Sequence, residues 1–260
     1  MNTDIIYEFP LNERMRVFMR LEHLFAQLLH FLHGNTMIDK RAVMTTLIDI
    51  LSIFSRNNLK PELLKEIERL SKILEEAPQL IALNPSELAV LRIDLEEMRK
   101  NLYEARGGKI GSKLIASSLF QSFTQRNAIP GGSCSFDLPA FHYWLSQEEA
   151  RQQRELKEWI EPLLEIHSAI QLVLNFIRKA CISSEEIAKG GFYQATLPLS
   201  EHQDSVQLLR VNVPQTTVCF AEISGGRHRF TVRFMIPAVD SERSTQTTED
   251  VRFILTRCQL

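Results

Sequence analysis

The β-sheet part of the fold is decided by one stretch of the chain, GGRHRFTVRFMI, which covers residues 225–236. The glycine doublet marks a turn, and the alternating Phe, Val and Ile that follow are typical of a β-strand. Successive side chains of a strand point to opposite faces of its sheet. One face of this strand would therefore be apolar and pack in a core, with Phe230, Val232, Phe234 and Ile236. The other face would carry Thr231 and three arginines: Arg227, Arg229 and Arg233.

The cationic face admits two interpretations. It could be a solvated outer face whose like charges discourage edge-to-edge aggregation of sheets. Alternatively, it could recognise acidic peptides or a C-terminus, because guanidinium groups are suited to carboxylates. Between residues 207 and 237 the chain has four arginines, Arg210 included, and one acid, Glu222, so the predicted local surplus of positive charge is three. The sequence by itself favours neither interpretation.

Further short segments rich in Val, Phe and Thr accompany this stretch. We predict strands over 191–197, 206–213, 217–223, 228–236 and 250–256, which would form an antiparallel β-rich region. Residues 3–9 are a short β-like run that ends at Pro10, and we expect this run to join the sheet as an edge strand. Residues 240–250, DSERSTQTTED, are predicted to be a mobile polar loop.

The preceding part of the chain is predicted to be helical. No glycine occurs between Lys40 and Arg106, and glycine destabilises a helix interior by about 1 kcal/mol. Apolar residues at helical spacing predict helices over 15–31 and 43–54, from Pro61 onward, from the start signal NPSE at 84–87 onward, over 112–125 and over 146–181, the last bent at Pro162.

The predicted fold class is therefore α+β. A bundle-like helical domain would cover residues 11–180, and residues 1–10 and 181–260 would form an antiparallel β-strand domain that takes in the N-terminal strand. The segment 128–145 could also pack on the β-strand domain.

Composition excludes several classes of protein. The chain has 260 residues and a formal net charge of −2, so bulk electrostatics would recruit neither nucleic acid nor an anionic membrane. Its four cysteines are scattered and form no C-x-x-C pair, which argues against a disulfide framework and a local zinc site. The first residues lack the pattern of a signal peptide, and the apolar runs are shorter than the ~18–20 residues of a membrane span. We expect an intracellular protein without a cofactor or a metal.

Enzyme signals are weak. Residues 106–113, RGGKIGSK, lack the spacing of a phosphate-binding loop. Cys134 and His142 could form a thiolate–imidazole pair, although a core cysteine beside a structural histidine is the favoured interpretation. A metal site formed by His23, His30 and His33 is disfavoured in the same way. Arg20, one helical turn after Arg16, and Arg56, at a helix end where it would complement the helix dipole, are most simply surface residues.

Several motifs together resemble those of a known family. They are FPLNERMR at 9–16, RLE at 20–22, IPGGSCSFDLP at 129–139 with His142 and Trp144, GFYQ at 191–194, LLR at 208–210 and RFTVRFM at 229–235. The chain is similar in these motifs to the ZapD family of bacterial cell-division proteins, and the likeness extends from end to end except near residue 240.

The resemblance implies a non-enzymatic division factor that works in the cytoplasm at midcell. Family members bind the C-terminal tail of the tubulin-like GTPase FtsZ and bundle its protofilaments, which promotes assembly of the Z-ring. They are homodimers that meet through their helical domains. A thiol-dependent enzyme that uses Cys134 and His142 is the alternative to this expectation.

The resemblance also implies which residues bind FtsZ. Positions that match the charged pattern of the family are Arg20, Arg56, His142, Arg229 and Arg233. Arg227 is added by strand geometry, because it would share a face with Arg229 and Arg233. At Ser118 this chain departs from the family pattern, which has an arginine, so this helix is not expected to contribute to the cationic surface.

Overall fold

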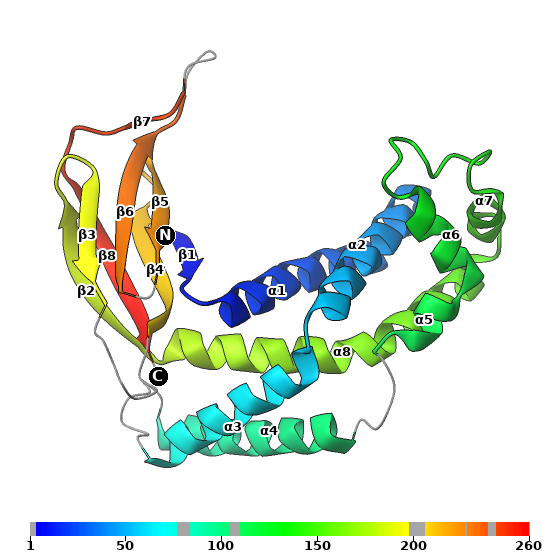
Figure 1. Ribbon diagram of the computed structural model, residues 1–260, viewed down its shortest axis with the longest axis horizontal. Helices are drawn as coiled ribbons and strands as arrows, with labels where there is room; N and C mark the ends of the chain where they lie inside the picture. Colours follow the sequence, from blue (N-terminus) through cyan, green and yellow to red (C-terminus); the bar gives the residue numbers. More distant parts are fainter. Residues whose placement is uncertain are drawn as a thin grey trace. The chain divides into compact units, whose positions relative to one another are not determined.

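The computed structural model describes residues 4–76, 84–104, 110–197, 206–226, 228–238 and 243–259 (Figure 1). The chain forms two compact units. The first comprises Met1–Arg16, Arg69–Arg92 and Val173–Leu260, and the second comprises Val17–Glu68 and Ile93–Leu172. Both helices and antiparallel sheets are present, so the predicted α+β class is confirmed.

Two antiparallel sheets lie in the first unit. Sheet A has the strand order β1-β4-β8-β2, with β1 Asp4–Pro10, β4 Val206–Pro214, β8 Val251–Gln259 and β2 Cys181–Ala188. Sheet B has the order β3-β6-β5, with β3 Phe192–Thr196, β6 Arg229–Ile236 and β5 Phe220–Gly225, and β7 Thr245–Gln246 also pairs with β6. The N-terminal strand pairs with β4 along its whole length, which confirms its predicted place at the edge of a sheet.

One hydrophobic core joins the inner faces of the two sheets. Its buried members come from both: Leu209, Val211, Val213, Phe253 and Leu255 from sheet A, and Ala221, Phe230, Val232 and Phe234 from sheet B. The alternation predicted for β6 is confirmed at Phe230, Val232 and Phe234, which are buried. The prediction is wrong for Ile236, which is 42% exposed because it ends the strand and pairs there with the two-residue strand β7. Burial of one face orients the other toward solvent.

The helices of the chain are α1 Glu13–Leu32, α2 Met37–Arg56, α3 Leu59–Glu76, α4 Pro85–Glu104, α5 Ser112–Ala116, α6 Ser118–Arg126, α7 Pro139–Leu145 and α8 Glu149–Lys179. In the second unit the apolar stripe predicted for the first helix is buried at Phe18, Leu21, Phe25 and Leu28. Among the described helices, α8 is long and apolar enough to span a membrane by length and composition, but half of its apolar window is buried, a property that the core helix of a soluble protein shares.

Three predictions of local structure are wrong. The helix expected over 112–125 is two helices, because Ser117 has extended backbone angles that separate α5 from α6. The helix expected over 146–181 ends at Lys179, and the strand β2, which was not predicted, begins at Cys181. The loop expected over 240–250 contains β7 in its described part, and Asp250 accepts a hydrogen bond from the Gly190 N–H at 2.8 Å.

Candidate peptide-binding face of sheet B

The outer face of sheet B is built around β6, the strand that lies between β3 and β5 (Figure 1). Arg229 and Arg233 are both exposed on this face and are separated by the half-buried Thr231. Their neighbours on the adjacent strands follow from the register: Thr196 is paired with Arg229, and Phe192 and Glu222 flank Arg233 on its two sides. The prediction that these two arginines share a solvent face is confirmed.

Arg233 has the more occupied surroundings. Its guanidinium carbon lies 6.0 Å from the centre of the Phe192 ring, a cation–π distance. Glu222 is its direct cross-strand partner on the other side. Across the described ranges, neither Arg233 nor Arg229 has a carboxylate within ion-pair distance. Both cations are therefore available to an external anion, and Arg229 has the less crowded position.

The middle of the face is neutral and hydrogen-bonded. Thr231 is paired with Ser224, and their hydroxyl oxygens lie 2.7 Å apart. Gln194 of β3 is the neighbour of Thr231 on the other side. This polar row separates the two arginines. The hydroxyl hydrogen bond between Ser224 and Thr231 also joins β5 to β6 on the face from which the arginines project.

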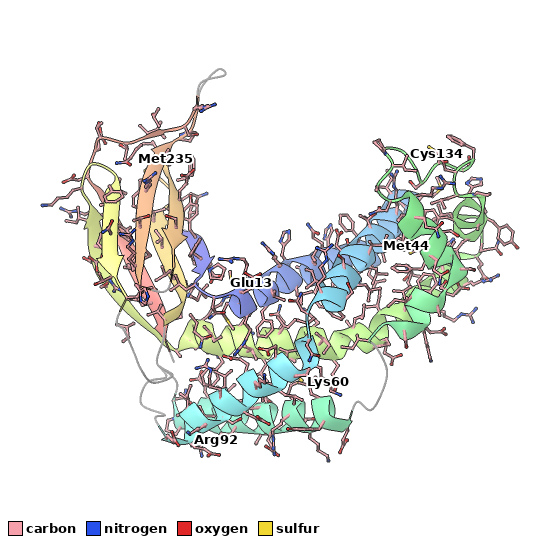
Figure 2. The ribbon with its side chains drawn as sticks, viewed as in Figure 1. Glu13, Met44, Lys60, Arg92, Cys134 and Met235 are labelled. Atoms are coloured by element: carbon pink, nitrogen blue, oxygen red, sulfur yellow. The ribbon has the colours of Figure 1, made fainter. Side chains whose placement is uncertain are left out.

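Beyond Arg233 the outer face carries three apolar side chains beside Gln246 of β7, which is exposed and pairs with Met235. Met235, labelled on β6 in Figure 2, is the direct cross-strand partner of Phe220. Phe192 lies diagonally across from Met235 and is 37% exposed. We call Phe192, Phe220 and Met235 the apolar shelf. The sequence could not predict this feature, because the three residues share one region of the sheet through a strand register that no local pattern fixes.

Arg210, which counts toward the local surplus of positive charge, does not lie on the cationic face. It lies on β4 of sheet A, directly opposite Glu8 of β1, and its Nε is 3.0 Å from Glu8 Oε1. Arg178 of α8 donates two hydrogen bonds to the same carboxylate, at 3.0 and 2.8 Å. The partly buried Glu8 thus binds both Arg210 and Arg178. On the outer face of sheet B the described charged residues are two cations, Arg229 and Arg233, and one anion, Glu222.

The other predicted site residues lie outside the described part of the chain or in the second unit. Arg227 lies outside the described residues. Arg20 on α1, Arg56 at the end of α2 and His142 on α7 are exposed and belong to the second unit. At a rise of 1.5 Å per residue, Arg56 lies about 16 Å from Thr45 along the axis of α2. The Thr45 hydroxyl in turn lies 3.4 Å from Asn127 Oδ1, at the end of α6.

The loop 127–138 between α6 and α7 is a tight succession of turns (Figure 2). The carbonyl of Cys134 accepts hydrogen bonds from the N–H groups of Asp137 and Leu138. Gly132 is required here, because a Cβ atom at this position would collide with the carbonyl oxygen of Arg126. Cys134 and His142 are both exposed, so the expected core cysteine beside a structural histidine is wrong. Among the described residues no hydrogen bond joins the Cys134 sulfur to the His142 ring. The geometry therefore lacks a formed thiolate–imidazole pair.

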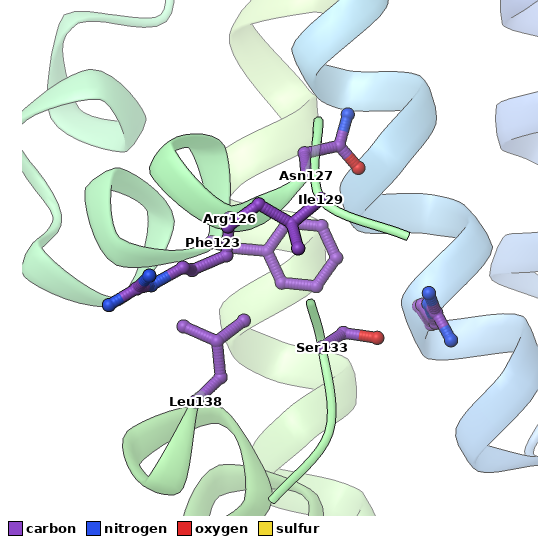
Figure 3. A pocket seen from close by; sticks show the side chains of 7 residues that line it. Phe123, Arg126, Asn127, Ile129, Ser133 and Leu138 are labelled. Atoms are coloured by element: carbon purple, nitrogen blue, oxygen red, sulfur yellow. The ribbon is translucent and has the colours of Figure 1, made fainter. Parts of the chain in front are cut away.

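A small recess lies beside this loop (Figure 3). It encloses about 180 Å³ including open solvent, and is lined by Arg41, Phe123, Arg126, Asn127, Ile129, Ser133 and Leu138. In Figure 3 the Phe123 ring occupies its centre, and the Arg126 guanidinium extends away from Ser133. The lining is mixed, with polar side chains from Arg41, Arg126, Asn127 and Ser133 beside three apolar ones. No group of three His, Cys, Asp or Glu side chains in the described ranges is placed to hold a metal ion.

The sequence of the chain is similar to those of known proteins of one family. The sequence profile of the ZapD family, described as a cell division protein, matches residues 19–233. The chain belongs to the ZapD family. Proteins named cell division protein ZapD from Methylococcus capsulatus, Nitrosomonas eutropha and Azoarcus are 44%, 38% and 33% identical to it. These alignments cover 100%, 98% and 98% of this chain and 100% of each relative.

Membership of the ZapD family assigns the chain a role in cell division. It also agrees with the motifs that carried the resemblance, most of which fall within the matched residues. Among these motifs, RFTVRFM at 229–235 is the one that forms the central strand of sheet B and presents Arg229 and Arg233 to solvent.

Proposed function

We propose that this ZapD-family chain binds the C-terminal tail of FtsZ through the outer face of sheet B. Two observations support the proposal: the chain belongs to a cell-division family, and Arg229 and Arg233 stand exposed on one sheet face without a carboxylate partner in the described part of the chain. The second observation carries the proposal, because guanidinium groups left free on one face suit the carboxylates of an acidic, extended segment.

The proposed mechanism is crosslinking by a dimer. Exposed ion pairs contribute only about 0.2–1 kcal/mol each, and ordering a disordered tail costs free energy, so one tail should bind weakly. A homodimer offers two binding faces, and a filament offers many tails. Bivalency can then raise the avidity by roughly 10²–10⁴, which is sufficient for a weak site to bundle protofilaments and promote Z-ring assembly in the cytoplasm at midcell.

Co-sedimentation with polymerised FtsZ tests the binding face. We expect the double variant Arg229→Glu, Arg233→Glu to lose most of its sedimentation with FtsZ filaments and most of its bundling, because both contacts become repulsive. Its melting temperature should fall only slightly: both side chains are exposed, and the loss comes from Arg233→Glu, which gives up the contact with Phe192 and faces Glu222 across the strand pair. FtsZ that lacks its C-terminal tail should not recruit the parent chain.

The matched control is the double variant Arg154→Glu, Arg252→Glu. Both residues are exposed, one on α8 and one on β8 of sheet A, and the change in net charge is identical. This control should sediment with FtsZ as the parent does. Unchanged bundling by the Arg229, Arg233 variant, or equal recruitment by tail-less FtsZ, would show that the proposed face is wrong.

A further inference from the structure

The outer face of sheet B has two chemically different ends. At one end Arg229 is exposed beside Thr196, and at the other the apolar shelf of Phe192, Phe220 and Met235 adjoins Arg233. Arg233 connects the cationic part of the face with the apolar shelf, because its guanidinium group lies against the Phe192 ring. A partner that used the arginines alone would leave the shelf exposed to water, so the face is complementary to a segment that carries both carboxylates and an apolar side chain.

The spacing of these features along β6 is fixed by strand geometry. A strand rises about 3.3 Å per residue, so the Cα atoms of Arg229 and Arg233 are about 13 Å apart and Met235 is about 7 Å further on. Thr231, between the arginines, is engaged with Ser224. The order along the strand is therefore a cation, a neutral row, a second cation and the apolar shelf.

We propose that this face receives an extended acidic segment of defined spacing. In that segment two carboxylates stand four residues apart, and an aliphatic or aromatic side chain follows two residues beyond the carboxylate that binds Arg233. The identity of the partner as the FtsZ tail rests on the proposed function, whereas the spacing rests on the sheet alone.

The four-residue spacing of the two acids requires an extended segment. In a helix, residues four apart are only about 6 Å apart along the axis, so two acids at that spacing cannot reach both arginines. In an extended segment, alternate side chains point the same way, so positions i, i+4 and i+6 all face the sheet. The same segment can therefore contact Arg229, Arg233 and the apolar shelf together.

Glu222 determines the side from which the second acid approaches. It is the cross-strand neighbour of Arg233 on β5, and its charge repels an incoming carboxylate. Phe192, on β3, flanks Arg233 on the opposite side. The incoming acid is therefore directed to the β3 side of Arg233, where the adjacent apolar side chain of the segment meets Phe192 and Met235.

Synthetic peptides test the spacing on the full-length chain. The matched peptide has two glutamates four positions apart and a leucine two positions after the second, in a Gly/Ser background. The first comparison peptide has the same composition with the two glutamates adjacent, and the second has alanine in place of leucine. At low salt, fluorescence anisotropy should show the matched peptide binding roughly fivefold more tightly than the adjacent-acid peptide and roughly threefold more tightly than the alanine peptide.

One variant of the chain assigns the leucine contact to the shelf. Met235→Gln makes the centre of the shelf polar. Met235→Gln should abolish the difference between the leucine and alanine peptides and leave the effect of acid spacing intact, a coupling that a double-mutant cycle measures. Arg252→Glu, on sheet A, should change neither difference.

Two results would overturn the proposal: equal binding of the matched and adjacent-acid peptides, or a leucine contribution that Met235→Gln leaves unchanged. Failure of the proposed function gives a different pattern. If the peptides follow the spacing rule while tail-less FtsZ recruits the chain as well as intact FtsZ does, the docking surface stands and the identity of its partner is wrong.

Discussion

At the scale of single residues, the position of an arginine decides what it can do. Arg210 and Arg229 are both strand residues of the first unit, yet Arg210 lies 3.0 Å from the partly buried Glu8, whereas Arg229 is exposed without an acid in the described ranges. An arginine held by a partly buried carboxylate is costly to redirect, because the acid would lose its partner. Only the exposed arginine is free to bind an external anion.

His167 provides a test of burial at the same scale. This residue of α8 packs against Phe25 of α1, with ring centroids 4.8 Å apart. Burial lowers the pKa of the His167 imidazole, and nearby Glu22 opposes that shift. As the pH falls through about 6.5, the usual histidine value, the unfolded chain therefore takes up the proton before the folded chain does. The free energy of unfolding should decrease across this range until the folded ring also protonates.

Thermal melts of the parent and of His167→Gln between pH 7.5 and 5 measure this contribution. The parent should lose more stability than the variant as the pH falls, because glutamine does not titrate. His142→Gln, at an exposed histidine, should behave as the parent. A variant curve parallel to that of the parent would show that His167 does not contribute to the pH dependence.

The residue-scale features that the sequence predicts are those with a local period. The alternation in β6 correctly separates the buried Phe230, Val232 and Phe234 from the exposed Arg229 and Arg233. The partners of Arg210 and Arg233 could not be predicted in the same way. Glu8 is bound by Arg178 across 170 residues of sequence, and such a contact is set by sheet topology rather than by local pattern.

At the scale of secondary structure, capping signals predict some boundaries well. The NPSE signal correctly places the start of α4, where the Glu87 N–H donates to Asn84 Oδ1 at 2.9 Å and the Asn84 N–H donates to Glu87 Oε2 at 3.0 Å. This reciprocal pair is a capping box, which satisfies two backbone donors at the helix start. Strand β2, CISSEEIA, escaped prediction because Ser and Glu favour strands weakly and pairing with β8 is what makes the segment extended.

The helix α7 was also missed, and its stability depends on a residue of the next helix. The buried side chain of Gln152 donates from Nε2 to the carbonyl oxygens of Trp144, Leu145 and Gln147, at 3.2, 3.0 and 2.9 Å. The Trp144 carbonyl also accepts a hydrogen bond from the Gln147 N–H at 3.1 Å, whereas the Gln152 amide is the described donor to the Leu145 and Gln147 carbonyls. Gln152→Leu would keep the volume but leave them unsatisfied, and we expect a loss of about 1–3 kcal/mol in the free energy of unfolding.

Chemical denaturation of Gln152→Leu beside Gln153→Leu measures this contribution. Gln153 is the half-buried neighbour, and its amide nitrogen lies 3.4 Å from Asn35 Oδ1 without reaching the end of α7. The control variant should therefore lose clearly less stability. Equal midpoints for the two variants would mean that water replaces the Gln152 amide at the end of α7 at no cost.

At the scale of the whole molecule, the division between helices and sheets follows from composition along the chain. The proposed bundling activity depends instead on the oligomeric state. The glycine-free stretch correctly predicts helices, and the Val- and Phe-rich stretch correctly predicts antiparallel sheets. A single peptide-binding face, however, can only decorate a filament. Crosslinking requires a second face, and a homodimer supplies it in the proposed mechanism.

Tail binding and bundling should consequently separate when the chain is diluted. Sedimentation velocity gives the fraction of dimer at each concentration, anisotropy of a labelled FtsZ tail peptide gives binding, and light scattering of FtsZ polymers gives bundling. Scattering should fall in parallel with the dimer fraction, because a monomer has lost the avidity of the second site. Occupancy of the tail peptide by each folded chain should instead follow one simple isotherm, whether the chain is monomeric or dimeric. Bundling that persisted where the chain is monomeric would require two tail sites on one chain, which would contradict crosslinking by a dimer.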